Sequence, residues 1–254
     1  MTVPHGFSGS SDKSLVCKLL KSLYGLKQAS RQWNIKLTTA LASSSFQQIH
    51  LDYSFFTKKI AGKIVIVLDY VDDLHITSDD FQLIQDTKDV LQSSFKIKDL
   101  GELKYFLGIE FARSAEGILM HQRKYALELI ADLDLSSSKP IITPMELNVK
   151  LTIVKFDNHV GSVEERALDD PGPYQRLLGY LLYLTITQPD ILFDVHCLSQ
   201  FMYSPKTSYW EAALRVVKYV KSCPDLGVLL SAVCFESLIA FCDVDWASCP
   251  NTRR

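Results

Sequence analysis

The chain has little that would mark a secreted, membrane-spanning or fibrous protein. Residues 1–20 lack the charged and then apolar segments of a signal peptide, and the longest apolar stretch, near residues 177–186, is about half of the ~20 residues that a bilayer span needs. Neither a glycine or proline period nor an internal repeat occurs. The six cysteines form no Cys-x-x-Cys pair and lack histidines at zinc-ligand spacing. They predict reduced thiols in an intracellular protein that is not secreted and has no membrane partner.

What the chain contains is an ordinary globular composition. It has 254 residues, of which 47% are hydrophobic and 22% charged, with a mean hydropathy of +0.07. Such a chain can form one large domain or two smaller ones. The net charge is −2, but residues 1–50 carry six basic side chains and one acidic side chain. A basic segment suits contact with a phosphate backbone, although a solvated helix face has the same composition.

The hydrophobic periodicity predicts a mixed fold of helices and hairpins. Helices are predicted over 21–42, 79–94, 122–133, 173–187, 190–203 and 207–222. Strands are predicted as hairpins over 63–77 and 103–121 and as single runs over 226–231 and 236–244. The polar stretch 136–172 is rich in Ser, Pro, Asn and Asp, and we expect it to separate two structural units.

The most informative short motif is Tyr70-Val71-Asp72-Asp73, in the middle of the first predicted hairpin. Adjacent carboxylates at the tip of an apolar hairpin can hold divalent cations, since Mg²⁺ prefers hard oxygen ligands. Two such ions about 3.5–4 Å apart can activate a 3′ hydroxyl and stabilise a leaving phosphate. Aspartate is also a common turn residue, so these four residues alone favour a plain polar turn. The wider context changes that interpretation.

Five longer stretches supply this context. SLYGLKQASRQW at 22–33 precedes the turn, and KDLGELKYFLGIE at 98–110 follows it. Further along are DPGPYQRLLGYLLYLTITQPDI at 170–191, SYWEAALRVVKYVK at 208–221 and FCDVDWASCPNTRR at 241–254. In this order and spacing, nearly the whole chain resembles the Pol polyproteins of Ty1/copia-type retrotransposons, from the reverse transcriptase to the start of RNase H.

The resemblance implies an α+β fold, with a partial reverse-transcriptase palm and thumb, a mainly helical connection and a truncated RNase H-like strand. Residues 1–135 would be the partial reverse transcriptase without its fingers and first catalytic motif. Residues 136–172 would be a linker, 173–231 the connection and 232–254 the start of RNase H. The implied activity is RNA-directed DNA polymerisation, in which dNTPs are added to a primer 3′ end with Mg²⁺. The implied partners are a primer–template and dNTPs.

The resemblance also implies roles for individual residues. Asp72 and Asp73 would be catalytic metal ligands of the polymerase, and Asp243 the first metal ligand of RNase H. The residues lying against template and nucleotide would be Gly25, Lys27, Gln28 and Arg31. The primer grip would consist of Leu107, Gly108 and Ile109. Structural interpretations are compatible with these roles: Gly25 can be a helix-entry turn, and Leu107 and Ile109 can belong to a buried strand face.

Two departures from the family pattern bear on the expected activity. Residues 1–21 hold nothing like the family's DVKTAFL-like strand, which adds an aspartate to the two-metal site, and eleven residues follow Asp243. With so few carboxylates, the isolated chain is expected to be inactive as an enzyme. The alternatives are a catalytically dead nucleic-acid-binding remnant and a non-functional product of a degenerate element.

Asp69 is a third departure, because the family usually has an apolar residue at this position. In an extended strand Asp69 shares a face with Val65 and Val67, which is expected to be packed. An unpaired carboxylate there would be unfavourable or would have a raised pKa, so Asp69→Val is expected to stabilise the fold. The alternative is that Asp69 replaces the missing metal ligand, although its side chain should point away from Asp72.

Overall fold

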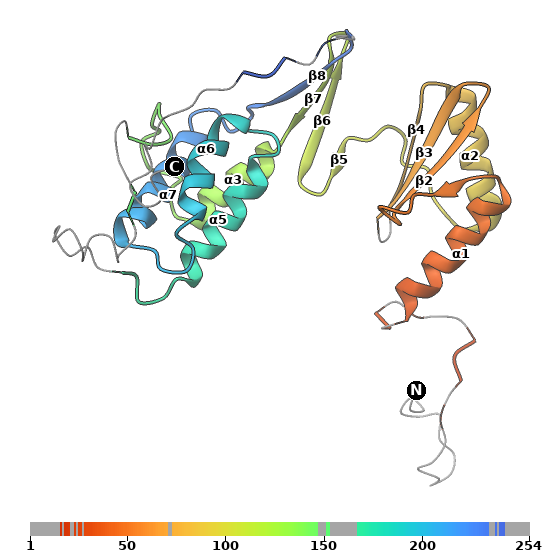
Figure 1. The fold of residues 1–254 in the computed structure, drawn as a ribbon, viewed down its shortest axis with the longest axis horizontal. Helices are drawn as coiled ribbons and strands as arrows, with labels where there is room; N and C mark the ends of the chain where they lie inside the picture. The colour runs from red at the N-terminus through yellow and green to blue at the C-terminus, as the bar shows by residue number, and fades with distance from the viewer. Residues whose placement is uncertain are drawn as a thin grey trace. The chain divides into compact units, whose positions relative to one another are not determined.

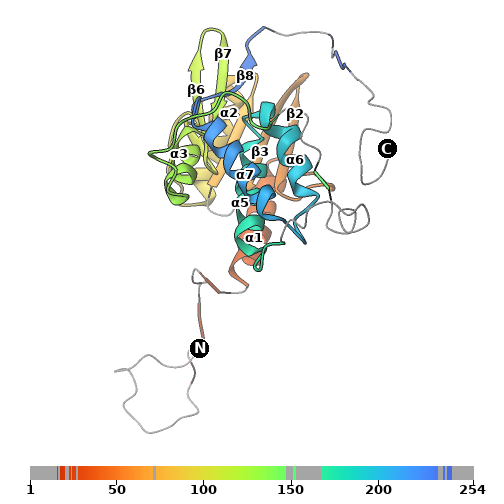
Figure 2. The same ribbon diagram turned by 90° about the vertical axis from the view of Figure 1, so that its left-hand side faces the viewer.

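The structure is a computed structural model, whose helices and strands are drawn in two views (Figure 1, Figure 2). It divides into two compact units, Met1–Gly101 and Glu102–Arg254. It describes residues 16, 18–20, 23, 25–26, 28–70, 73–146, 151–152, 167–233, 237 and 239–241. Within these residues, no helix is long and apolar enough to cross a membrane. Together the units have six described α-helices and two antiparallel sheets, a mixed α and β fold.

The described part of the first unit is one antiparallel sheet with two helices. Helix α1 (Ala29–Ser43) leads into strands β1 (Gln47–Gln48), β2 (Phe55–Ile60), β3 (Lys63–Tyr70) and β4 (Asp73–Ser78), which are followed by α2 (Phe81–Ser94). The strands pair in chain order. The predicted hairpin over 63–77 and the helix over 79–94 are confirmed. The helix predicted from residue 21 begins later, because Gly25 takes a left-handed conformation, φ +83°, that interrupts a helical path.

The core of the first unit lies between the sheet and its helices. Leu37 and Leu41 of α1 and Leu91 of α2 pack against Val65 and Val67 of β3, and all five are buried. Since side chains alternate along a strand, this burial fixes which face of the sheet the helices cover. The carboxylate of Asp80 accepts a hydrogen bond from the Gln82 backbone nitrogen at 2.8 Å, which caps the start of α2.

The second unit combines a sheet with a helical bundle. Its elements are β5 (Tyr105–Phe106), β6 (Ile109–Ser114), β7 (Gly117–His121), α3 (Arg123–Asp132), α5 (Gly172–Leu184), the 3₁₀ helix η1 (Pro189–Ile191), α6 (Leu192–Ser199), α7 (Thr207–Val220) and β8 (Gly227–Ser231). The predicted hairpin over 103–121, the four helices and the strand over 226–231 are confirmed. Of the strand predicted over 236–244, residues 237 and 239–241 are described and are not in a strand.

The boundary between the two compact units falls between Gly101 and Glu102. The sequence instead predicts a boundary within 136–172. Two long-range contacts account for the difference. Strand β8 pairs with β7 across the polar stretch, and α3 shares one core with α5, α6 and α7. Gly117 permits this strand pairing, since a β-carbon there would lie 2.1 Å from the carbonyl oxygen of Leu230. The hairpin and α3 therefore belong with the helical region.

Candidate functional site

The end of the β3–β4 hairpin holds the described half of the Tyr-Val-Asp-Asp motif. Tyr70 ends β3, Asp73 begins β4, and the two residues are register partners. Both are exposed, Tyr70 by 43%. Asp72, predicted to be the principal metal ligand, lies outside the described residues. The structure thus places a tyrosine and a carboxylate side by side at the tip of an apolar hairpin.

Tyr70 and Asp73 lie on the sheet face opposite the helices. Direct register partners share a face, and Tyr70 is an odd number of residues from both Val65 and Val67. Within the described part of the first unit, both helices pack on the face of Val65 and Val67. Among the described elements of this unit, neither helix therefore packs on the face of Tyr70 and Asp73.

Asp69 lies on the helix side of the same strand, as predicted. It is half-buried, and its Oδ1 accepts a hydrogen bond from Trp33 Nε1 of α1 at 3.1 Å. Trp33 in turn packs edge-to-face on Phe95, with 5.1 Å between the ring centroids. Burial raises the pKa of the Asp69 carboxyl, and the hydrogen bond from Trp33 opposes part of that rise. Asp69 thus has a partner on α1, and its side chain lies on the opposite sheet face from Asp73.

The described carboxylates do not by themselves fit a two-metal centre. Among the residues that the structure describes, no group of three or more His, Cys, Asp or Glu side chains could hold a metal ion. Each Mg²⁺ usually takes one or two protein carboxylates. Asp73 is the described member of the predicted ligand set, whereas Asp72 and Asp243 lie outside the described residues. One carboxylate is too few for a pair of ions.

The predicted template-side residues lie at and just before the start of α1. Gly25 has φ +83° with open space where a β-carbon would stand, in agreement with a helix-entry turn. Gln28 is the residue that precedes α1, and Arg31 is exposed on its first turn. Lys27 lies outside the described residues. Gly25, Gln28 and Arg31 are all exposed, so they are available for contact.

The predicted primer grip is the β5–β6 hairpin of the second unit. Phe106 and Ile109 are register partners, so Leu107 and Gly108 form a two-residue turn. Their φ angles are +50° and +81°, the signs of a type I′ turn. Ile109 is half-buried at the start of β6, but Leu107 is 44% exposed. The interpretation of Leu107 as a buried strand residue is wrong, because the hairpin turns at this residue.

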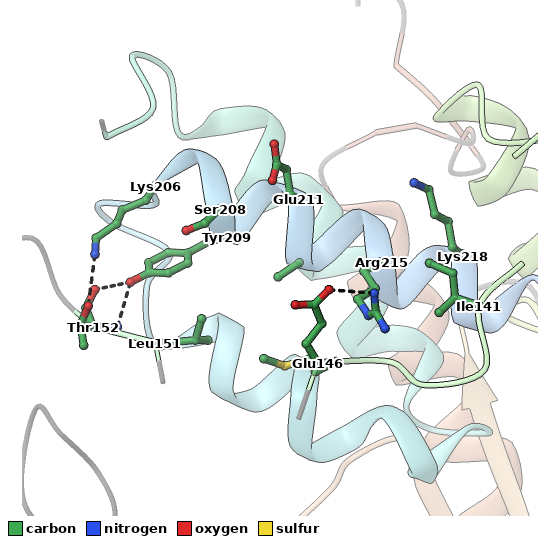
Figure 3. Close-up of a pocket in the computed structure, with 12 residues that line it drawn as sticks. Ile141, Glu146, Leu151, Thr152, Lys206, Ser208, Tyr209, Glu211, Arg215 and Lys218 are labelled. Carbon is green, nitrogen blue, oxygen red and sulfur yellow. Dashed lines mark hydrogen bonds and ion pairs between the residues drawn. The ribbon is translucent and has the colours of Figure 1, made fainter. Parts of the chain in front are cut away.

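A separate cavity of about 450 Å³ lies in the second unit between α7 and the described residues of 141–152 (Figure 3). Two polar contacts link its two sides. Arg215 pairs with Glu146 at 3.1 Å, and Lys206 donates to the Thr152 hydroxyl at 3.3 Å (Figure 3). Lys206 also lies 5.3 Å from the centroid of the Tyr209 ring. None of the predicted site residues lines the cavity, and these contacts dock the described residues of 141–152 on α7.

The reverse transcriptase (RNA-dependent DNA polymerase) family profile matches residues 1–147. The chain therefore belongs to the reverse transcriptase family. No solved structure matches it.

The curated relatives show which type of reverse transcriptase the chain resembles. The Retrovirus-related Pol polyprotein from transposon RE2 of Arabidopsis thaliana is 39% identical over 247 residues, covering 97% of this chain and 16% of the relative. The Pol polyprotein from transposon TNT 1-94 of Nicotiana tabacum is 32% identical over 262 residues, covering 100% of this chain and 19% of the relative. The uncharacterized mitochondrial protein AtMg00810 of Arabidopsis thaliana is 34% identical over 185 residues, 73% of each chain. The resemblance to Ty1/copia-type Pol polyproteins is confirmed, and the chain spans less than one fifth of those two polyproteins.

Proposed function

We propose that this chain is the part of a retrotransposon Pol polyprotein that presents the catalytic turn and the primer grip of an RNA-directed DNA polymerase. The observation that carries the proposal is the pairing of Tyr70 with Asp73 on the sheet face opposite the helices. A polymerase must leave the carboxylates of this turn open to the primer end and the incoming dNTP. Helices α1 and α2 instead pack on the opposite face, against Val65 and Val67, and stabilise the sheet there.

In this proposal the first unit contributes the palm, and the β5–β6 turn contributes the primer grip. Asp72 and Asp73 are the polymerase carboxylates, and Asp243 is the corresponding RNase H carboxylate. The family implies Mg²⁺ as the cofactor, but the described residues supply too few ligands for it. The function proposed for this 254-residue chain is therefore primer–template binding, and polymerisation is proposed for the longer protein.

Phosphate contacts are expected along the basic N-terminal segment. Lys18 and Arg31 are exposed, and Lys27 adds a third positive charge in this segment. The Lys36 ammonium group lies 5.0 Å from the centroid of the Phe95 ring, so its charge is partly engaged within the unit. Binding that depends on such contacts is independent of base sequence and weakens as salt displaces the protein from the backbone.

The test is the salt dependence of binding to a labelled RNA–DNA primer–template, measured by fluorescence anisotropy. The variant is Lys27→Ala with Arg31→Ala, and the matched control is Lys96→Ala with Lys98→Ala. We expect the first pair to weaken binding and to reduce the slope of log affinity against log salt by about 2, because two phosphate contacts are lost. The control should keep the wild-type slope. Equal slopes for both pairs would contradict the proposed interface.

A second candidate function is a nucleic-acid-binding protein without catalysis. The exposed basic side chains of Lys18 and Arg31 support it, because they can contact phosphates without any catalytic carboxylate. Primer extension with Mg²⁺ or Mn²⁺ tests whether this chain alone catalyses polymerisation. The purified chain should bind the duplex and leave the primer unextended, since it contributes too few carboxylates. Extension that disappears in Asp72→Asn would instead show a working polymerase in this chain alone.

A further inference from the structure

The turn at Leu107 and Gly108 holds a conformation that its own sequence does not favour. A type I′ turn requires positive φ at both central residues and prefers Asn-Gly. Here the first position is leucine, with φ +50°. The β-carbon of an L-residue is crowded in this left-handed conformation. Residues held in this way persist where the surrounding structure imposes the conformation, and they cluster at functional sites.

The imposed conformation comes from tyrosines on α5 and α3. The Tyr183 hydroxyl, on α5, donates a hydrogen bond to the Leu107 carbonyl oxygen. A β-carbon on Gly108 would lie 3.6 Å from Tyr183 Cε1 and 3.9 Å from Tyr125 Cδ2. The turn backbone therefore lies directly against the two aromatic rings, with a hydrogen bond at the strained residue.

Tyr125 supports Tyr183 from α3. The two rings meet edge-to-face, with 5.3 Å between their centroids. The Tyr125 hydroxyl donates to the Tyr180 carbonyl oxygen at 3.3 Å, which links α3 to α5. Burial raises the pKa of Tyr125 to about 12, so this hydroxyl remains a donor at neutral pH. The two helices thus form a fixed support behind the turn.

A second attachment holds the same hairpin to α3. The Glu110 carboxylate accepts a hydrogen bond from the Lys124 backbone nitrogen at 2.9 Å, in the first turn of α3. A carboxylate is favoured at a helix N-terminus, where backbone N–H groups lack partners. On the outer side, Leu107 and Tyr105 are 44% and 55% exposed. These hydrogen bonds attach the hairpin to α3 and α5, whereas the Leu107 and Tyr105 side chains remain exposed.

We propose that Tyr183, supported by Tyr125, is the positioning residue of the primer grip: its hydroxyl holds the Leu107–Gly108 turn in the conformation that meets the primer 3′ end. The inference rests on the proposed function of this turn. It means that the helical connection acts on the polymerase directly, because α5 determines the shape of the grip. Tyr183 acts through the turn and does not touch the primer itself.

The first experiment measures the turn without nucleic acid. Tyr183→Phe removes the hydroxyl and keeps the ring, and Tyr180→Phe on the same helix is the matched control. A hydrogen bond of about 1 kcal/mol corresponds to about fivefold in an equilibrium constant. We therefore expect amide hydrogen exchange over residues 105–110 to become about fivefold faster in full-length Tyr183→Phe and to stay unchanged in Tyr180→Phe. Unchanged exchange in Tyr183→Phe would overturn the proposal.

A rescue variant separates positioning from a general loss of packing. Leu107→Asn adds the residue that a type I′ turn prefers. In the Tyr183→Phe background it should restore most of the exchange protection, because the turn then holds its conformation by local preference. Failure of Leu107→Asn to restore protection would show that Tyr183 does not act through the turn.

The second experiment uses a primer–template whose primer 3′ end carries a photoreactive nucleotide. Wild-type protein should crosslink at residues 105–110, and Tyr183→Phe should show a several-fold lower yield there at equal duplex occupancy. Absence of a wild-type crosslink at this turn would overturn the primer-grip assignment together with the inference. A normal crosslink in Tyr183→Phe would leave the primer grip in place and overturn the role of Tyr183 alone.

Discussion

Asp69 is the position where the structure reverses the expected effect of a mutation. The sequence predicts that Asp69→Val is stabilising, because valine matches Val65 and Val67 on the packed face. In the structure, valine would remove the acceptor of the hydrogen bond from Trp33 Nε1. A donor left without its acceptor costs about 1–3 kcal/mol, whereas the strand preference of valine contributes at most about 1 kcal/mol. Taking about 2 kcal/mol for the unpaired Trp33 N–H and subtracting about 1 kcal/mol for valine, we expect a net loss of about 1 kcal/mol.

This loss is large enough to measure. For a unit of about 100 residues, 1 kcal/mol lowers the thermal midpoint by about 4–8 °C. The assay is unfolding of the full chain followed by the fluorescence of Trp33, with Trp210 and Trp246 replaced by phenylalanine in every variant. The control is Asp69→Asn, which keeps an acceptor oxygen and should stay within about 0.5 kcal/mol of wild type. A higher midpoint for Asp69→Val, or equal losses for both variants, would refute the reasoning.

Three further predictions concern the protonation of Asp69 and two other contacts. Folding raises the pKa of Asp69 above 3.8. Its contribution to stability relative to Asp69→Asn is therefore full below about pH 4 and is lost as pH rises through the raised pKa. In urea unfolding, a stability difference between the two proteins that grows between pH 4 and 7 would contradict this. Gly117→Val places a β-carbon against the Leu230 carbonyl oxygen and should destabilise the second unit by about 2–4 kcal/mol, with faster amide exchange over β8. Gly179→Ala, in open space on α5, should leave stability and exchange unchanged. Equal exchange over β8 in the two variants would show that β8 tolerates the side chain. Lys221 Nζ donates to the carbonyl oxygens of Leu135, Ser136 and Ser138. Lys221→Met should therefore lower the free energy of unfolding by about 2 kcal/mol, whereas Lys218→Met should change it little. Similar urea midpoints for the two variants would contradict the role of these bonds.

The sequence predicts the local elements well, because each is determined by nearby residues. The alternation around Val65 and Val67 predicts both the hairpin and the face on which Asp69 lies. The pattern that predicts α2 fails only at the boundary, where Asp80 caps the helix and Phe81 begins it, two residues later than predicted. β2 is missed because its second half, Thr57 to Ile60, is partly polar and carries no clear apolar alternation.

The long-range contacts were not predictable in this way. The hydrogen bond between Tyr183 and Leu107 joins residues 76 positions apart, and no periodic pattern links a helix tyrosine to a hairpin carbonyl. The pairing of β7 with β8 crosses the polar stretch that looks like a boundary. Trp33 was the one partner with a signal, because it shares the predicted helix face with Leu37 and Leu41. A tryptophan beside an unpaired carboxylate could have suggested the hydrogen bond to Asp69.

The most direct test of the central claim is an amide hydrogen-exchange footprint of the full chain with and without a primer–template duplex. The sheet face of Tyr70 and Asp73 and the primer grip should bind the duplex. Slower amide exchange is therefore predicted at β3, β4 and residues 105–110. Helix α2, which packs on the opposite face of the sheet, should show no change. Protection over α2 with none at the β3–β4 hairpin, or no footprint at a saturating duplex concentration, would contradict the account.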